Sequence, residues 1–125
     1  MSNPFNVINN SVEEIEVTNK EIELKEQIET LLKSGTVVLF MKGNADFPQC
    51  GFSANSVAIL KHLTVPFKTF NILNDPEIRQ GLKEYSNWPT YPQLYVNGKL
   101  IGGNDIITEM YQSGDLQEYL KEALK

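Results

Sequence analysis

Cysteine and histidine are almost absent from this sequence of 125 residues: Cys50 is the only cysteine and His62 the only histidine. A single cysteine excludes a disulfide within the chain, so the fold must be stable without such a cross-link, which suits a reducing compartment. Long apolar runs are also absent. The longest, Val37–Met41, has the length of a strand and falls far short of the about 20 residues of a membrane-spanning helix. We therefore expect no membrane partner.

Basic residues are in deficit, with 11 Lys and Arg against 16 Asp and Glu and a net charge of −5. Residues 1–36 hold seven Glu and three Lys, so most of the negative charge lies at the start. Neither part of the chain has the dense positive surface that phosphate backbones require, and we predict no nucleic-acid partner. The acidic start, with no Arg before Arg79, is unlike a transit peptide. The sequence thus predicts a cytoplasmic protein, with the nucleus as a second location, and a mitochondrial one only if a transit peptide precedes this sequence.

The chain divides into two predicted parts. Residues 1–17 are rich in Asn and Glu with scattered apolar side chains, which predicts a flexible arm. Residues 18–125 form one predicted domain, which opens with a helix near Thr18 or Asn19, because Thr18 and Glu21 have the spacing of a capping box. The apolar stripe of this helix is predicted to consist of Leu24, Ile28, Leu31 and Leu32.

Strands and helices then alternate. The apolar patterns predict strands at 37–41, 67–72, 93–96 and 99–101 and helices at 51–63, from Asp75, from Asn104 to Gly114, and from there to the end. We expect Tyr85 and Tyr119 on the buried faces of their helices. The alternation implies a parallel pair of strands, and a hairpin around Asn97 and Gly98, in a type I′ turn, adds antiparallel strands. The fold class is therefore α/β, a four-stranded mixed sheet flanked by helices on both faces.

Cys50 lies where a loop leaves a buried strand and a helix begins. A lone cysteine is by itself more often a small buried apolar residue than a reactive one. At a helix start, however, unpaired backbone N–H groups and the positive end of the helix dipole stabilise a thiolate. Gly51, the next residue, lets the backbone approach a ligand closely. The position therefore predicts a reactive thiol.

Two strings carry a family resemblance. MKGNADFPQCGFS (41–53) and SNWPTYPQLYVNGKLIGG (86–103), followed by Asn104 and Asp105, resemble the monothiol glutaredoxins of the CGFS type over roughly residues 20–125. Tyr91 before Pro92, and a residue other than Cys after Gly103, are more similar to the cytosolic, PICOT-like branch. The resemblance implies a thioredoxin-like fold, bound glutathione, a bound 2Fe-2S cluster, and BolA-like proteins and apo iron–sulfur proteins as partners.

The number of sulfur ligands agrees with a shared cluster. A 2Fe-2S centre takes four thiolates or equivalent ligands, and this chain has one. Two copies in a homodimer would supply Cys50 twice, and two glutathione molecules would supply the remaining sulfurs. Ser53 lies where a dithiol relative carries its second cysteine, so the chain cannot close a disulfide of its own.

The resemblance also implies the residues of a glutathione site. Lys42 and Arg79 are expected to pair with glutathione carboxylates, and Lys83, one turn after Arg79, is a weaker candidate. Pro92 resembles the family's cis-proline, which leaves the Tyr91 backbone free to pair with the cysteinyl unit. The expected cofactor-binding residues are Lys42, Cys50, Phe52, Arg79, Tyr91, Asn104 and Asp105, with Cys50 as the catalytic residue and the metal ligand.

Each of these residues also has a purely structural interpretation. Phe52 could equally be core at the start of its helix, and Asn104 and Asp105 are good N-cap residues. At Asn104 the family often has Cys, Leu or Ala, but we expect the backbone N–H groups to bind the γ-glutamyl carboxylate and Asp105 its ammonium group. Trp88 and Pro89 are expected to support the proline loop without binding the ligand, and His62 is not expected to be a cluster ligand.

Three functions remain open at this point. The first is an iron–sulfur carrier and transfer protein with a role in iron homeostasis. The second is a glutathione-dependent oxidoreductase of weak activity, which would remove glutathione from mixed disulfides through Cys50 alone. The third is an interaction domain without redox chemistry.

Overall fold

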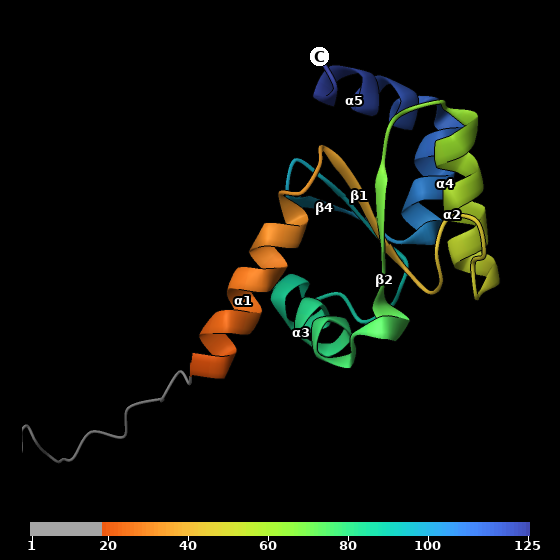
Figure 1. The fold of residues 1–125 in the computed structure, drawn as a ribbon. Coiled ribbons are helices and arrows are strands. Elements are labelled where there is room, and N and C mark those ends of the chain that lie inside the picture. The colour runs from red at the N-terminus through yellow and green to blue at the C-terminus, as the bar shows by residue number, and fades with distance from the viewer. Residues whose placement is uncertain (1–18) are drawn as a thin grey trace, which may run out of the picture.

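The computed structural model describes residues 19–125, so the predicted arm at 1–17 and the predicted cap at Thr18 lie outside the described residues. The helices are α1 (Asn19–Leu32), α2 (Gly51–His62), α3 (Pro76–Ser86), α4 (Asn104–Ser113) and α5 (Asp115–Ala123), with a short 3₁₀ helix η1 (Ile72–Asn74). The strands are β1 (Val37–Met41), β2 (Lys68–Asn71), β3 (Gln93–Val96) and β4 (Lys99–Gly102). Figure 1 shows the sheet between α1 and the pair of α2 and α4.

The four strands form one mixed sheet in the order β2-β1-β3-β4. Strands β1 and β2 run parallel, whereas β3 pairs antiparallel with both β1 and β4. Asn97 and Gly98, between β3 and β4, have φ values of 52° and 79°. Two successive positive φ values are those of a type I′ turn. The predicted mixed sheet and hairpin are therefore confirmed.

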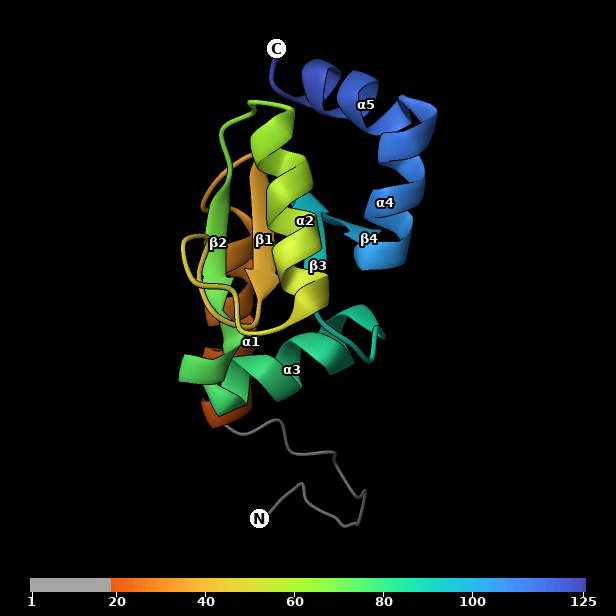
Figure 2. The ribbon, with the colours of Figure 1, turned by 90° about the vertical axis from the view of Figure 1, so that its right-hand side faces the viewer.

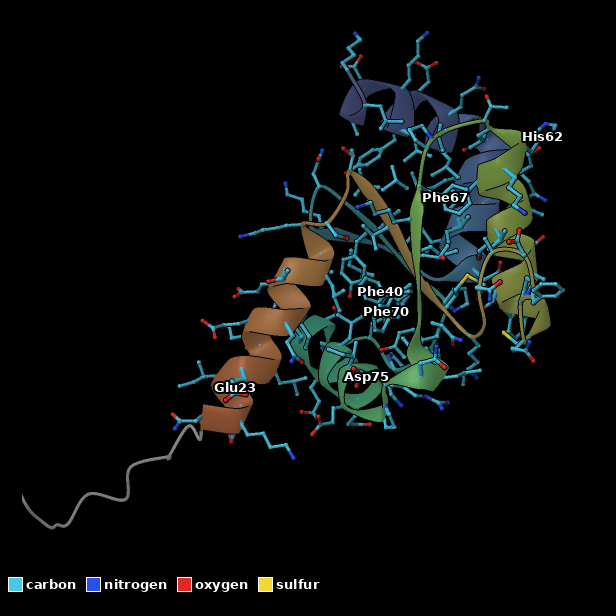
Figure 3. All side chains as sticks on the ribbon, in the orientation of Figure 1. Glu23, Phe40, His62, Phe67, Phe70 and Asp75 are labelled. Carbon is cyan, nitrogen blue, oxygen red and sulfur yellow. The ribbon has the colours of Figure 1, made fainter. Side chains whose placement is uncertain are left out.

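Strand β1 divides the core into two layers, because successive side chains point to opposite faces. Leu39 and its same-face neighbours pack with residues of α2, α4 and α5, whereas Phe40 packs with residues of α1 and α3. In Figure 2, α2 lies in front of the sheet and α1 behind it. Figure 3 shows Phe40 and Phe70 close together on the α3 side, with ring centroids 5.7 Å apart. Helices thus cover both faces, as predicted.

Several details differ from the sequence prediction, among them a start of β2 at Lys68 and an end of β4 at Gly102. Tyr85 and Tyr119 are 45% and 40% exposed, because Ile78 and Leu82 in α3, like Leu116 and Leu120 in α5, already fill the contact with the core. Strand β2 ends at Asn71, whose side-chain oxygen accepts the Leu73 N–H and starts η1. Helix α2 ends at His62.

The topology brings several chain segments to one end of the sheet. There β1 and β4 end and β3 begins, so the loop before α2, the loop at 87–92 and the start of α4 meet. Loops at the carboxyl ends of parallel strands are the usual place for a ligand site in such sheets. In the part of the chain that the structure describes, no helix combines the length and the apolar character needed to cross a membrane.

Candidate functional site

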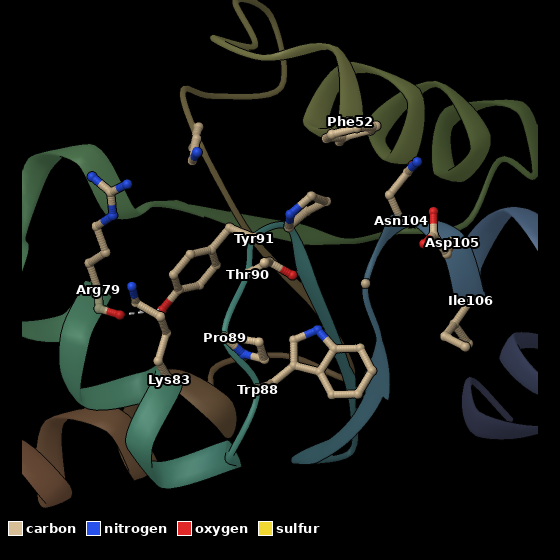
Figure 4. A pocket seen from close by; sticks show the side chains of 13 residues that line it. Phe52, Arg79, Lys83, Trp88, Pro89, Thr90, Tyr91, Asn104, Asp105 and Ile106 are labelled. Carbon is tan, nitrogen blue, oxygen red and sulfur yellow. Dashed lines mark hydrogen bonds between the residues drawn. The ribbon is translucent and has the colours of Figure 1, made fainter.

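A pocket of about 420 Å³ opens at this end of the sheet. Figure 4 shows Phe52 of α2 above it, Arg79 and Lys83 of α3 on one side, and Asp105 of α4 on the other. The lining residues are Lys42, Phe52, Arg79, Lys83, Trp88, Pro89, Thr90, Tyr91, Pro92, Gly103, Asn104, Asp105 and Ile106. Phe52 is 64% exposed, which decides against the interpretation as core and in favour of a place beside the pocket.

Cys50 is the N-cap residue of α2 and is partly exposed. Its sulfur accepts the Ser53 backbone N–H at 3.3 Å, so the thiol takes the capping role that a serine or aspartate oxygen has in other helices. The Ser53 hydroxyl also lies 3.3 Å from the sulfur. A polar environment at a helix start is the one that favours a thiolate.

The pKa of Cys50 is below the ordinary value for a thiol. Partial burial alone would raise the pKa, but the hydrogen bond with the Ser53 hydroxyl and those from the Ser53 and Phe52 N–H groups, together with the Lys42 charge, lower it by more. The sequence predicted this effect from the helix start. It did not predict the contribution of the Ser53 hydroxyl, which lies against the Cys50 sulfur.

Ser53 is completely buried and connects the thiol to the pocket. Its oxygen accepts the Lys42 backbone N–H at 3.1 Å while its hydroxyl faces the Cys50 sulfur. Lys42 lines the pocket, so a hydrogen-bonded chain of three residues links the end of β1 to the thiol. Ser53 therefore has a structural role at this position.

The charges that line the pocket are separated. Lys42, Arg79 and Lys83 are half-buried, and none of the three forms an ion pair within residues 19–125. Asp105 lies across the pocket from Arg79 and Lys83. Unpaired, partly desolvated cations attract carboxylates more strongly than fully hydrated ones. Lys83, the weaker candidate in the sequence, thus lines the pocket together with the stronger ones.

The floor of the pocket includes the loop before β3. The Tyr91–Pro92 peptide bond is cis, as predicted, and Tyr91 is 6% exposed. The Tyr91 hydroxyl donates to the Arg79 carbonyl oxygen at 2.7 Å, a bond drawn in Figure 4, and burial raises the pKa of this hydroxyl well above its ordinary value. The backbone N–H and C=O of Tyr91 have no partner among the described residues.

Sequence reasoning missed the residue that holds this loop. Gln93 is completely buried, and its amide nitrogen donates to the carbonyl oxygens of Trp88 and Thr90 at 3.1 and 3.2 Å. Its amide oxygen accepts the Tyr95 hydroxyl at 2.7 Å, and that hydroxyl also contacts Ser86. The only signal in the sequence was a glutamine at the first position of an otherwise apolar predicted strand. Trp88 and Pro89, predicted to lie beneath the loop, line the pocket itself.

The first turn of α4 forms the remaining side. Gly103 is the N-cap residue and provides no side-chain cap, so the first N–H groups of the helix are without intrahelical partners. Such groups, with the helix dipole, bind anions. Asn104 and Asp105 both line the pocket, and the oxygen of Asn104 contacts α2, which the sequence did not predict. The structure therefore brings all the predicted binding residues to one end of the sheet.

Comparisons with known proteins agree with this arrangement. The glutaredoxin family model matches residues 37–101. An uncharacterized monothiol glutaredoxin of Synechocystis is 57% identical over 102 residues, which are 82% of this chain and 95% of that protein. The chloroplastic monothiol glutaredoxin-S14 of Arabidopsis thaliana is 56% identical over 82% of this chain and 59% of its own length.

A solved structure agrees as well. The solution structure of reduced apo GrxS14 from poplar is 55% identical and superposes with a TM-score of 0.72, covering 81% of this chain and 93% of that one. The fold and the single thiol at a helix start define a thioredoxin-like protein of the glutaredoxin class. The chain belongs to the glutaredoxin family and, by its relatives, to the monothiol members of it. Its closeness to the PICOT-like branch stays a prediction.

Proposed function

We propose that this chain binds glutathione in the pocket and that two copies, with two glutathione molecules, hold a 2Fe-2S cluster as cargo for transfer to other proteins. The observation that carries the proposal is the separation of charge around the pocket. Unpaired cations lie on one side, and a carboxylate with free helix N–H groups lies on the other. The thiol with a lowered pKa belongs to Cys50, which is the N-cap residue of α2 two residues before Phe52 of the pocket lining, and the Lys42 charge contributes to the lowering.

The charges of glutathione match those of the pocket. Its glycyl carboxylate would pair with Arg79 and Lys83, or with Lys42, and its γ-glutamyl carboxylate would accept the N–H groups at the start of α4. Asp105 would take the ammonium group. The unpaired N–H and C=O of Tyr91 would pair with the cysteinyl unit, as an added strand pairs with a sheet edge. The ligand's sulfur would then lie near Cys50.

The residues present fit a cluster that is shared between subunits. Across the described residues, no group of three or more His, Cys, Asp or Glu side chains could hold a metal ion, so one chain offers Cys50 alone. A bound cluster would take one thiolate from each of two chains and one from each glutathione. Cys50 would be the metal ligand, and the hydrogen bonds from Ser53 and Phe52 would hold its sulfur in the ionised form.

A second candidate function is the removal of glutathione from mixed disulfides. The lowered pKa and partial exposure of Cys50 favour it. The Cys50 thiolate would attack the glutathione sulfur of the mixed disulfide and release the target's thiolate. The thiolate of a second glutathione would then attack the Cys50–glutathione disulfide, which yields oxidised glutathione and restores Cys50. With no second cysteine, the reaction depends on that second glutathione.

Partners and location belong to the same proposal. A homodimer bridged by the cluster, BolA-like proteins and apo iron–sulfur proteins stay predictions from the family resemblance, as does a cytoplasmic location. Two relatives are named as chloroplastic and another as mitochondrial, so the location differs among relatives of similar sequence.

Anaerobic reconstitution with iron, sulfide and glutathione tests the proposal. We expect visible absorption from the bound cluster, dependent on glutathione, and its loss in Cys50→Ser, which removes the one cysteine that the chain contributes. A Ser113→Ala variant, in an exposed residue of α4, serves as the control. A colourless protein that rapidly reduces a glutathionyl mixed disulfide would favour the second candidate. A full cluster in Cys50→Ser would overturn both.

A further inference from the structure

We propose that the Asn104 side chain is a positioning residue that fixes the start of α4 to α2 and thereby sets the distance between the Cys50 thiol and the anion-binding N–H groups. The inference rests on the proposed function, because it assigns the γ-glutamyl end of glutathione to the start of α4. The contact joins side chains of α2 and α4, and we expect it to determine the affinity for glutathione.

Asn104 contacts α2 through its amide oxygen. This oxygen accepts the Asn55 amide N–H at 2.9 Å and the Ser56 hydroxyl at 3.0 Å. The same Asn55 amide also donates to the Thr108 hydroxyl at 3.0 Å, one turn further along α4. We call these four residues the α2–α4 clasp. In Figure 4 the Asn104 side chain rises from the start of α4 toward α2.

Burial distinguishes one bond of the clasp from ordinary surface hydrogen bonds: the two bonds of Asn55 are exposed, whereas the bond of Ser56 is partly buried. Ser56 is completely buried, and its hydroxyl donates to no other described residue. A buried hydroxyl without its partner would lose the hydrogen bond that compensates for its lost hydration. The clasp therefore favours one separation of the two helices, and a shift of α4 would break it.

The clasp lies close to both chemical groups of the proposed site. Ser56 is one helical turn after Ser53, which contacts the Cys50 sulfur. Asn104 is the first residue of α4, whose N-cap, Gly103, has no side-chain hydrogen bond. Among the described residues, the side-chain hydrogen bonds that connect the start of α4 to another element are therefore those of the clasp. A displacement of about 1 Å at a binding group can cost a large factor in function, so this link has a direct effect on the site.

The geometry also distinguishes the parts of Asn104 and Asp105. Two donors from α2 occupy the two lone pairs of the Asn104 oxygen, so this oxygen is not available for the ligand's ammonium group. That contact falls to Asp105. Asn104 would then act on the ligand only through its backbone N–H, with its side chain directed to α2.

Affinity for glutathione, measured by calorimetry, gives the first test. Ser56 does not line the pocket, yet Ser56→Ala and Asn104→Ala are each expected to weaken binding about 3- to 10-fold, the range of one lost hydrogen bond. The double variant is expected to lose little more than Asn104→Ala alone, because both changes break the same contact. The pH profile of Cys50 alkylation is expected to stay unchanged, since the bonds to its sulfur remain. Wild-type affinity in both single variants would overturn the inference.

Ile28→Val is the matched control, because Ile28 belongs to the core on the opposite face of the sheet. It is expected to lower stability toward urea while leaving the affinity within about twofold, since one lost methylene is felt in the core but not in the pocket. An equal loss of affinity in Ile28→Val would mean that any destabilisation weakens binding, and the inference would fail.

Backbone amide relaxation without ligand keeps the inference separate from the proposed function. In Ser56→Ala and Asn104→Ala, the order parameters of amides 104–106 are expected to fall, whereas those of 51–53 stay unchanged. Unchanged values at 104–106 would overturn the clasp whether or not glutathione binds. The order parameters could fall as expected in the variants although the wild-type chain does not bind glutathione. The clasp would then be a contact that orders α4, but its role in affinity would be wrong. The proposed function would fail as well.

Discussion

The two sides of the pocket are built by different means. On the α3 side, the proposed binding groups are the charged side chains of Arg79 and Lys83. On the α4 side, they are backbone N–H groups at the helix start, with Asp105 beside them. Charged side chains can be removed individually by substitution, and salt screens their charges. A substitution cannot remove a backbone N–H group and can only displace it. Binding on the α4 side should therefore depend on how precisely the first turn of α4 is positioned.

The largest effect is expected from Gly103→Ala. A Cβ atom there would lie 3.2 Å from the Pro92 carbonyl oxygen and 3.3 Å from the Trp88 indole nitrogen, so the turn and these neighbours would have to move apart by a few tenths of an ångström. We expect glutathione affinity to fall by a factor of about 10 to 100 in calorimetry, because the displaced N–H groups no longer meet the carboxylate. Gly35→Ala, where the Cβ meets only the flexible Lys68 side chain, is the matched control. Equal affinity in the two variants would contradict the assignment of the α4 side.

Arg79→Ala is expected to lower the affinity about 10-fold at low salt, since a charge-assisted hydrogen bond to a carboxylate is lost. The wild-type affinity should fall with added salt, and the variant's less so. Truncated ligands sharpen the comparison of the two sides. The Arg79→Ala effect should persist with cysteinylglycine and vanish with γ-glutamylcysteine, which lacks the glycyl carboxylate. The reverse result would exchange the two ends of the ligand.

Ser53→Ala is expected to raise the pKa of Cys50, because it removes the hydroxyl that stabilises the thiolate. Since the folded-state pKa is lowered in the wild type, the thiolate is populated at a lower pH than in a free cysteine, and the variant's alkylation curve should move to higher pH. At neutral pH, alkylation should slow severalfold. Competition with a model thiol measures the rates. An unmoved curve would show that the backbone N–H groups of Phe52 and Ser53 and the Lys42 charge lower the pKa of Cys50 without the Ser53 hydroxyl.

The smallest effect is expected from Lys83→Ala, which should weaken glutathione binding about 2- to 3-fold, a loss typical of a single ion pair that solvent still screens. Lys33→Ala, which does not line the pocket, is the matched control for the loss of a surface charge. A loss as large as that in Arg79→Ala would mean that Lys83 is the main carboxylate contact on the α3 side.

Much of the fold followed from local patterns. The apolar run of β1, the Asn97 and Gly98 turn and the proline at the start of α3 each specify structure over a few residues, and all three predictions are confirmed. Tyr85 and Tyr119 were predicted wrongly, because a helical stripe indicates which side faces the core but not how wide the contact is.

The residues of the candidate site likewise divide into those that the sequence predicted and those that required the structure. Lys42, Arg79 and Asp105 were predicted because their residue types and positions match a family pattern. The clasp between Asn104 and Ser56, and the support of the 88–90 loop by Gln93, join residues through tertiary packing. Asn104 and Ser56 are 48 residues apart in the sequence. No local pattern reports such a contact, so these roles required the structure.

The most direct test of the central claim is the mass of the protein under non-denaturing conditions before and after anaerobic reconstitution with iron, sulfide and glutathione. A chain with one sulfur ligand, beside a pocket suited to glutathione, should change from a monomer to a dimer that carries one 2Fe-2S cluster and two glutathione molecules. A product that stays monomeric, or a dimeric cluster protein without glutathione, would contradict the account.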